Sequence, residues 1–286
     1  GEGEGEGGFE GEDEDEGAVV PAKSTVSQES VEGEYSNSQP TICGYFQASK
    51  ADRKPLSIVR ADRGDKVVLS LYDHSTLALQ PWREAGFTCF AFDSKHPEGE
   101  TVKHGVHCRR ADLFDEATLR GIEEEFRGRA VFVSAFPPCT DLSCAGAQHW
   151  PAKAKADPNF MNEAAGRIRR LRDRLRRWER LAGRFYIENP ETGQLKAYLG
   201  HPEHKFDPCD FGLYLTKNDT HPVKGFPPRD RYRKKTGLWV GGDFRFPKRR
   251  AVKAQAFSVQ DMAQHERSHT PRGFARAVCL ANYELA

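Results

Sequence analysis

The chain has 286 residues and a formal net charge of +1, which is enough length for one large α/β domain with appendages or for two small domains. It contains no apolar stretch near the roughly 18 residues of a membrane span, and its start lacks the basic, apolar pattern of a secretion signal. Seven cysteines fit no disulfide-scaffold pattern, which indicates a reducing compartment. These features argue against a membrane or secreted protein and predict an intracellular one, cytoplasmic or nuclear.

Charge is divided unevenly along the chain. Residues 1–50 contain twelve acidic residues but only Lys23 and Lys50, a net charge of −10 that leaves +11 on residues 51–286. The Gly/Glu repeats and the Ser-rich stretch after them offer too little apolar surface to fold, so we predict a disordered acidic tail. The basic excess of the remaining chain fits a polyanionic partner.

From residue 66 onward, short apolar strands alternate with amphipathic helices. The expected strands are Val67–Tyr72, Thr88–Phe92, Val106–Arg109, Ala130–Phe136 and Arg184–Ile187. The expected helices are Ala78–Ala85, Asp115–Phe126, Asn159–Ala182 and Pro271–Tyr283. Residues 97–105 read as a loop, and residues 190–256 contain only Thr236–Val240 as a clear strand. This alternation predicts a Rossmann-like α/β fold: a doubly wound, mostly parallel sheet with a small irregular C-terminal region.

Polar or reactive side chains follow every expected strand of the parallel sheet. They are Asp73, Asp93, Asp112, Cys139 and the pair Glu188-Asn189. Ligands bind beyond the carboxyl ends of parallel strands, so we expect these groups to line one rim. Asp93 lies twenty residues beyond Asp73, which is the spacing from a first cofactor loop to the acid that binds ribose hydroxyls. One such acid could merely cap a helix, but their coincidence favours a nucleotide-type cofactor site.

Cys139 follows a buried strand within Pro137-Pro138-Cys139, and Glu188 ends the next strand. A thiolate can add to carbon 6 of a pyrimidine while a carboxyl group protonates or holds nitrogen 3, which makes carbon 5 nucleophilic enough to take an alkyl group. Basic neighbours, or a helix beginning after Asp141, would lower the pKa of the thiol and supply the thiolate. The competing interpretation is a strand-ending turn with an inert thiol and a Glu-Asn-Pro cap.

Eight arginines occupy residues 166–180. The apolar residues between them recur at helical spacing and should face the core, which leaves Arg169, Arg172 and Arg176 on the solvent side. These arginines form either a surface that tracks phosphates or an ordinary solvated helix face, and the sequence favours neither.

A cluster of metal-ligand types lies further along. His201, His204 and Cys209 could supply three zinc ligands, but no fourth follows at finger spacing. No metal site is therefore expected.

At these motifs the chain resembles the DNA (cytosine-5) methyltransferase family, particularly its compact members in phages and large viruses. The resemblance runs from about Val67 to Leu285. Pro137-Pro138-Cys139 with Ser143 resembles the catalytic Pro-Cys motif, and Glu188-Asn189 resembles the Glu-Asn motif. The resemblance implies methylation of cytosine carbon 5 in DNA, with the base flipped out of the duplex and attacked by Cys139.

The resemblance also implies S-adenosylmethionine as cofactor. The positions assigned to it are Asp73, His74, Ser75, Asp93, Asp112 and Pro137. Asp93 falls at the ribose position and Asp112 at the adenine position. Thr270-Pro271 with the final helix resembles the C-terminal motif that packs back beside the cofactor.

Further positions are assigned to the nucleic acid. Residues 233–236 resemble the basic motif that holds the target base, which makes Arg233 or Lys235 the partner of the pyrimidine oxygen. Contacts to DNA are assigned to Ser143, Arg169, Arg172 and Arg176. The resemblance divides the chain into the tail 1–50, a cofactor-binding and catalytic half 51–190, a small target-binding region 191–257 and a helix that packs back on the catalytic half, 258–286.

The chain departs from the family pattern in three places. The first cofactor loop, residues 72–77, contains no glycine, Thr140 stands for a glutamine and Pro190 for a valine. About thirty residues remain for target recognition, so an additional protein could supply sequence specificity. Two alternatives stay open: an inactive DNA-binding protein on the same scaffold, or a related enzyme that acts on RNA or nucleotides or transfers another group. If the chain is viral, it works in the host cell.

Overall fold

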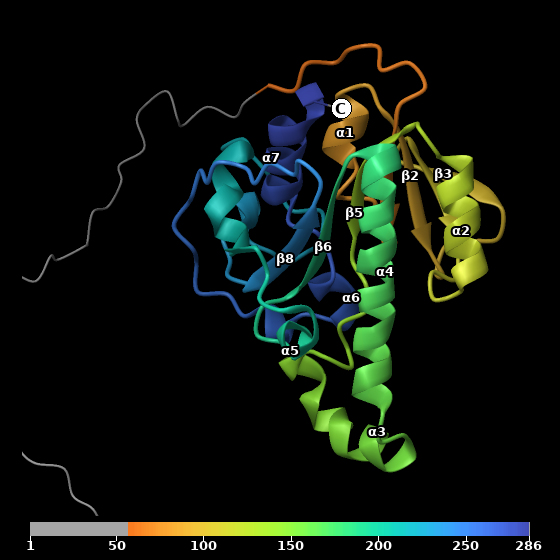
Figure 1. Cartoon of the computed structure of the whole chain (residues 1–286). Coiled ribbons are helices and arrows are strands. Elements are labelled where there is room, and N and C mark those ends of the chain that lie inside the picture. The colour runs from red at the N-terminus through yellow and green to blue at the C-terminus, as the bar shows by residue number, and fades with distance from the viewer. Residues whose placement is uncertain (1–56, 286) are drawn as a thin grey trace, which may run out of the picture. The chain divides into compact units, whose positions relative to one another are not determined.

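The computed structural model describes residues 57–285, without the side chains of 179–182, 264 and 285 (Figure 1). The predicted acidic tail, residues 1–50, lies outside the described residues. Eight strands form one mixed sheet in the order β3-β4-β2-β1-β5-β6-β8-β7. Their bounds are β1 Val67–Leu71, β2 Thr88–Asp93, β3 Glu100–Lys103, β4 Val106–Arg110, β5 Ala130–Ala135, β6 Arg184–Pro190, β7 His204–Phe206 and β8 Thr236–Gly241.

The middle of the sheet is parallel and its edges are antiparallel. Strands β4, β2, β1, β5 and β6 run in one direction. Strand β3 pairs antiparallel with β4, and β8 pairs antiparallel with both β6 and β7. The predicted α/β class with a mostly parallel sheet is therefore confirmed.

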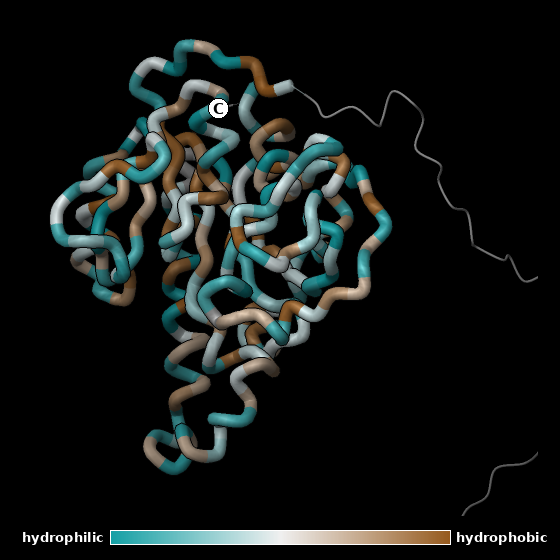
Figure 2. Tube along the Cα trace, turned by 180° about the vertical axis from the view of Figure 1, so that it is seen from behind, coloured by the Kyte–Doolittle hydropathy of each residue, from teal (hydrophilic) through white to brown (hydrophobic). Residues whose placement is uncertain are grey.

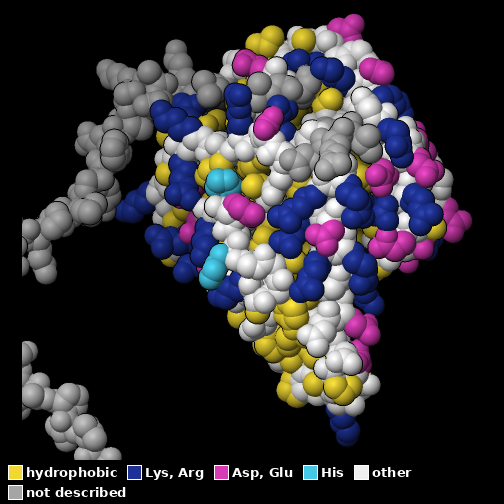
Figure 3. All heavy atoms as spheres, viewed as in Figure 1, with side chains coloured by type: hydrophobic (Ala, Val, Ile, Leu, Met, Phe, Trp, Pro, Cys, Tyr) yellow, Lys and Arg dark blue, Asp and Glu magenta, His cyan; other side chains and the backbone are white. Residues whose placement is uncertain are grey.

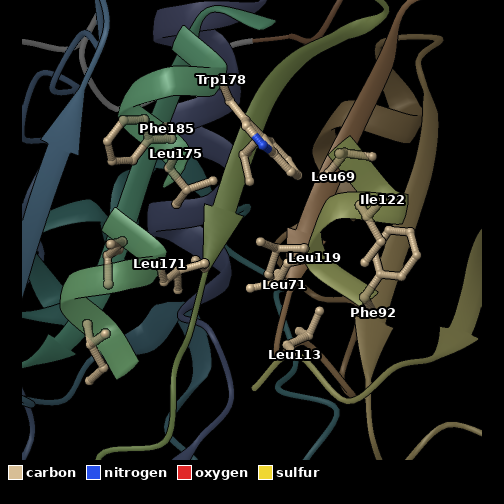
Figure 4. Packing of buried hydrophobic residues seen from close by; sticks show 14 of the residues in the cluster. Leu69, Leu71, Phe92, Leu113, Leu119, Ile122, Leu171, Leu175, Trp178 and Phe185 are labelled. Carbon is tan, nitrogen blue, oxygen red and sulfur yellow. The ribbon is translucent and has the colours of Figure 1, made fainter. Parts of the chain in front are cut away.

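Helices cover both faces of the sheet. They are α1 Gln80–Glu84, α2 Glu116–Glu125, α3 Trp150–Ala156, α4 Phe160–Ala182, α5 Leu195–Leu199, α6 Gln264–Arg267 and α7 Arg272–Asn282. One core lies between the sheet and helices α2 and α4, where Leu119, Leu171 and Trp178 pack against strand residues (Figure 4). A second core on the opposite face joins α1 and α7 to the sheet through Trp82 and Phe274.

The apolar runs explain where the strands lie. All five residues of β1 are buried, because helices cover both faces of this central strand. In the view from behind, hydrophobic segments run through the central strands while the surrounding loops are mostly hydrophilic (Figure 2). Local signals fix the connections as well. Asp115 caps α2 by accepting hydrogen bonds from the backbone nitrogens of Ala117 and Thr118, and Gly86 (φ +98°) passes so close to Ala61 that a Cβ would lie 2.1 Å from its oxygen.

The structure corrects the expected elements in three regions. Residues 97–105 are not simply a loop, because Glu100–Lys103 forms the edge strand β3, joined to β4 by a turn through His104 (φ +52°) and Gly105 (φ +74°). Strand β6 continues past Ile187 to Pro190, where β8 pairs with it. Helices α3 and α5 and strand β7 form where no element was expected. Among residues 57–285, no helix combines the length and the hydrophobicity needed to cross a membrane.

Candidate active site

The candidate site lies where β5 and β6 end side by side. These strands are parallel, with Ala135 paired to Ile187, so the segments that follow them emerge at the same rim of the sheet. Asn189 is buried and joins the two segments, because its Nδ2 donates a hydrogen bond to the backbone oxygen of Pro137 (3.1 Å). The Pro-Pro-Cys turn and the Glu-Asn pair are therefore held against each other, as their positions at neighbouring strand ends predicted.

Backbone contacts fix the turn that carries Cys139. The backbone nitrogens of Leu142 and Ser143 donate to the oxygen of Cys139 at 2.9 and 2.8 Å. The oxygen of Leu142 in turn accepts a hydrogen bond from the backbone nitrogen of Gln194 (2.6 Å). Gly193 permits this approach, since a Cβ there would lie 2.8 Å from the oxygen of Leu142. The loop after β6 thus buttresses the loop after β5.

The thiol of Cys139 is half-buried, and its surroundings favour the neutral form. Burial raises its pKa above the ordinary value, and the carboxylate of Glu188 raises it further. Lys234 and a hydrogen bond from Ser143 act in the opposite direction. The net direction is opposite to the expected lowering of the pKa, because burial and the charge of Glu188 together outweigh Lys234 and Ser143.

Glu188 offers an open acceptor beside this thiol. Its side chain is 14% exposed, and its Oε1 lies 3.8 Å from Nζ of Lys234. That oxygen is buried and accepts no hydrogen bond within the described structure. A buried carboxylate oxygen without a donor is costly, so this position is suited to a ligand that brings an N–H group.

The basic residue beside Glu188 is one that the sequence reasoning missed. Arg233 and Lys235, which the sequence assigned to the pyrimidine oxygen, are both exposed, whereas Lys234 between them is half-buried with its Nζ 3.8 Å from Oε1 of Glu188. Burial alternates along residues 232–236, as it does where alternate side chains of an extended segment share a side. Tyr232 and Thr236 are buried. The apolar Tyr232 was the signal that could have identified Lys234 as the inward-facing member of the basic run.

The first loop keeps a left-handed backbone although it contains no glycine. Tyr72 (φ +59°) and Thr76 (φ +67°) both adopt conformations that favour glycine. The carboxylate of Asp73 holds the loop in this shape by accepting hydrogen bonds from the hydroxyls of Ser70 (2.9 Å) and Ser75 (2.8 Å) and from the backbone nitrogen of Thr76 (2.8 Å). Asp73 and Ser75 are therefore engaged within the loop, while His74 is exposed.

The two other acids assigned to the cofactor flank Tyr72. Asp93 is half-buried at the end of β2, and Asp112 is exposed after β4. Burial raises the pKa of Tyr72 most, the charge of Asp112 raises it further, and Glu116 and Asp93 add to the rise. Tyr72 donates a hydrogen bond to the backbone oxygen of Leu113 (2.8 Å), and the ring of Phe114, which is 43% exposed, lies 5.6 Å from the ring of Tyr72. An aromatic edge with two acids thus lines the rim beyond β1, β2 and β4.

The arginines assigned to nucleic acid are partly engaged elsewhere in the fold. Arg169 and Arg172 on α4 donate to the backbone oxygens of Tyr198 (3.2 Å) and Leu199 (3.0 Å), in the last turn of α5. Arg176 is exposed. On the face shown in Figure 3, Lys and Arg side chains along α4 are interspersed with acidic ones. Ser143 is buried, and its backbone nitrogen donates to the oxygen of Cys139, so the structure brings this residue to the candidate site.

The suspected zinc ligands do not gather. Cys209 is buried in the core, and the ring of His204 stacks on Phe246 with centroids 4.4 Å apart. Within residues 57–285, no three His, Cys, Asp or Glu side chains are grouped as metal ligands would be.

No protein-family model matches the chain, and no curated protein matches it. The chemistry of the rim is thus the basis for a functional assignment.

Proposed function

We propose that the chain is an S-adenosylmethionine-dependent enzyme that methylates carbon 5 of cytosine in DNA. The observation that carries this proposal is the pairing of a thiol and a carboxylate at the ends of neighbouring parallel strands. Cys139 follows β5, Glu188 lies at the end of β6, and the Asn189 hydrogen bond to Pro137 joins the two segments. Attack on a pyrimidine ring needs these two groups on one base.

The reaction follows from these side chains. The thiolate of Cys139 adds to carbon 6 of the flipped cytosine, and Glu188 holds or protonates nitrogen 3, which turns carbon 5 into a nucleophile. S-adenosylmethionine would supply the methyl group. Loss of the proton from carbon 5 then allows the bond between carbon 6 and the thiol to break, which frees Cys139. Lys234, next to Glu188, is the basic group best placed to steady charge on the ring.

In this scheme, binding of the base would reduce the rise in the pKa of Cys139. The charge of Glu188 is its second cause, after burial. When base binding brings a proton from solvent between Glu188 and nitrogen 3 of the base, the charge of Glu188 is partly neutralised and its repulsion of the thiolate falls. Lys234 and Ser143 then act with less opposition. Substrate binding would therefore favour the thiolate of Cys139, whereas in the free enzyme Cys139 would remain a neutral thiol.

The order of the strands supports a Rossmann-like assignment. Across the sheet, the parallel strands follow the order β4-β2-β1-β5-β6. In chain order these are the third, second, first, fourth and fifth parallel strands, which is the order of dinucleotide-binding folds. The order reverses between β1 and β5, where ligands bind in such sheets. The first loop follows β1 and Cys139 follows β5, so cofactor and base would meet at this point.

The residues of the rim fit a nucleoside cofactor. Asp93 ends β2 with a carboxylate that could accept from ribose hydroxyls. Tyr72 and the exposed ring of Phe114 offer aromatic surface to a purine, beside the carboxylate of Asp112. Tyr72 and Thr76 adopt left-handed conformations, so the backbone of the loop follows a path that usually requires glycine.

One alternative has an observation in its favour. The carboxylate of Asp73 already accepts hydrogen bonds at the first loop, from Ser70, Ser75 and the backbone nitrogen of Thr76. Such a loop would also suit a DNA-binding protein of the same fold that has lost its cofactor. Direct measurement of S-adenosylmethionine binding separates the two readings. Mass analysis of cytosines after reaction with duplex DNA, RNA and dCMP separates a DNA enzyme from one that acts on RNA or nucleotides, or transfers another group.

The first prediction is covalent trapping at Cys139. Duplex DNA containing 5-fluorocytosine should form a stable adduct in the presence of S-adenosylmethionine, because fluorine at carbon 5 blocks the final elimination. Peptide mass spectrometry would locate the adduct. Cys139→Ser should form none, while Cys144→Ser, which removes an exposed cysteine nearby, should form as much as the unaltered chain. An adduct at Cys144, or undiminished methylation by Cys139→Ser, would refute the assignment.

A further inference from the structure

A strained stretch of backbone precedes Lys234. Arg229 (φ +58°) and Asp230 (φ +49°) are consecutive, and both are left-handed, a conformation that is unfavourable for residues other than glycine. Such residues persist only where the surrounding structure holds them, and they often occur near functional sites. Lys234, which lies beside Glu188, follows in the same segment. The contacts that hold this stretch therefore also influence where Lys234 lies.

Arg272, the first residue of α7, holds the stretch through Asp219. Its Nη1 donates to Oδ1 of Asp219 at 2.7 Å, and its Nη2 donates to Oδ2 at 2.6 Å. Oδ2 of Asp219 also accepts a hydrogen bond from the backbone nitrogen of Arg229 (2.8 Å). The side chains of Arg272 and Asp219 are only 18% and 11% exposed, so salt and solvent screen this ion pair less than a surface pair.

The second left-handed residue is tied to the same helix. Oδ2 of the buried Asp230 accepts a hydrogen bond from the backbone nitrogen of Gly273 (2.7 Å). Its Oδ1 lies 3.9 Å from Nη2 of Arg272. The first turn of α7 thus holds both left-handed residues, one through Asp219 and one directly.

The chain between these residues and Lys234 is packed. The backbone nitrogen of Tyr232 donates to the oxygen of Asp230 (2.7 Å). The buried ring of Tyr232 lies between those of Phe226 and Phe257, with centroids 5.2 and 5.6 Å away. A displacement at Asp230 is therefore passed along a short segment to Lys234.

We propose that Arg272 is a positioning residue that keeps Lys234 beside Glu188. It acts through Asp219 and Asp230, which hold the left-handed stretch. Without the guanidinium, Asp219 is a half-buried carboxylate that has lost its cation, so the stretch relaxes and Lys234 moves away from Glu188. The inference rests on the proposed function, in which Lys234 steadies charge on the ring of the base.

The pH dependence of Cys139 alkylation by iodoacetamide tests the proposal, in a Cys144→Ser background that removes the exposed thiol nearby. Lys234 opposes the rise in the pKa of Cys139. Arg272→Met should therefore move the midpoint of the profile to higher pH and slow alkylation at neutral pH about threefold. Arg272→Lys, which keeps the charge, should restore most of the rate. Arg276→Met, which removes a salt bridge elsewhere on α7, should leave the profile unchanged.

A merely structural role of Arg272 predicts a shift of the opposite sign. Burial is the largest cause of the raised pKa of Cys139, so a variant that only loosened the fold would expose the thiol and lower the midpoint. In a Lys234→Met background, Arg272→Met should shift the midpoint no further, because the cation that Arg272 positions is already absent. A lowered or unmoved midpoint, or an equal shift in both backgrounds, would overturn the positioning role.

A second variant and a second readout keep the test independent of folding and of the proposed function. Asp219→Asn weakens the same ion pair with little change of shape and should shift the midpoint in the same direction. Alkylation needs neither cofactor nor DNA, so it decides the role of Arg272 even if the unaltered chain methylates no cytosine, a result that would overturn the proposed function alone. In an active chain, Arg272→Met should lower kcat and leave KM for DNA nearly unchanged. A raised KM with unchanged kcat would contradict the positioning role.

Discussion

Lys234 and Lys235 are adjacent in sequence but differ in what they can do. Nζ of Lys234 lies 3.8 Å from Oε1 of Glu188 and opposes the rise in the pKa of Cys139 that burial and Glu188 cause, whereas Lys235 is exposed. We predict that Lys234→Met raises the pKa of Cys139 and slows methylation by about tenfold or more, because it removes the cation that opposes Glu188. The pH dependence of Cys139 alkylation by iodoacetamide reads the thiol directly.

Lys235→Met is the matched control for this prediction. It removes the same charge from the neighbouring position and should leave both the alkylation profile and the methylation rate nearly unchanged. The reverse result, with Lys235 essential and Lys234 dispensable, would support the assignment made from the sequence and would show that the proximity of Lys234 to Glu188 does not matter for the reaction.

Asp230 makes the stability of the fold depend on pH. Its side chain is fully buried, its Oδ2 accepts a hydrogen bond from the backbone nitrogen of Gly273 (2.7 Å), and burial raises its pKa from 3.8 to about 6. The folded state therefore binds this proton more tightly than the unfolded state. The contribution of Asp230 to the free energy of unfolding is greatest below about pH 4 and declines as pH rises to about 6, by on the order of 2 kcal/mol.

Asp230→Asn tests this dependence, since an amide oxygen can still accept from Gly273 but does not titrate. Urea unfolding should show that the difference in free energy of unfolding between variant and unaltered chain grows in favour of Asn between pH 4 and pH 6. A constant difference across that range would show that Asp230 does not titrate there in the folded state.

At the scale of elements, Asn189 couples the end of β6 to the turn after β5. Its Nδ2 is the donor to the buried backbone oxygen of Pro137. We predict that Asn189→Ala lowers the free energy of unfolding by about 1–3 kcal/mol, because it leaves that oxygen unsatisfied. It should also slow trapping at Cys139. Denaturation by guanidinium measures the first effect, and Asn218→Ala, at an exposed position, should cost almost nothing. Equal stability of the two variants would discount the hydrogen bond as a clamp.

The elements that the sequence predicted correctly are those with an internal signal. Strands β1, β2 and β5 are apolar runs, and α2 begins at a capping aspartate. Strand β3 was missed because its sequence, Glu100–Lys103, is short and half polar, and Val102 remains 65% exposed at the sheet edge. Strand β7 has three residues and forms through pairing with β8. Such elements depend on a partner, which local propensity does not reveal.

The candidate site was predictable to the same extent. Cys139 and Glu188 follow apolar strands, so their meeting at one rim follows from a parallel sheet. The position of Lys234 depends on which side of the segment before β8 is buried. That is a tertiary feature, which the spacing of residues alone does not contain.

At the scale of the whole molecule, the two parts of the chain carry opposite charge. Residues 1–50 carry −10 and residues 51–286 carry +11. The same basic excess that we propose to attract DNA would therefore also attract the acidic residues of the tail. A tethered polyanion competes at an effective concentration on the order of millimolar for a short flexible tether, and less for a longer one. Exposed arginines such as Arg176 would be shared between the two polyanions.

Deleting residues 1–50 should consequently tighten non-specific DNA binding at low salt. The advantage should shrink as salt rises, because screening weakens the attraction of the tail as well as that of DNA. Chemistry at Cys139 should proceed at the same rate once DNA is saturating, since the tail competes for phosphate contacts only. Binding isotherms of the full and shortened chains across a salt series give the measurement. If the isotherms superimpose at low salt, the opposite charges of the two parts do not interact and the tail serves solubility alone.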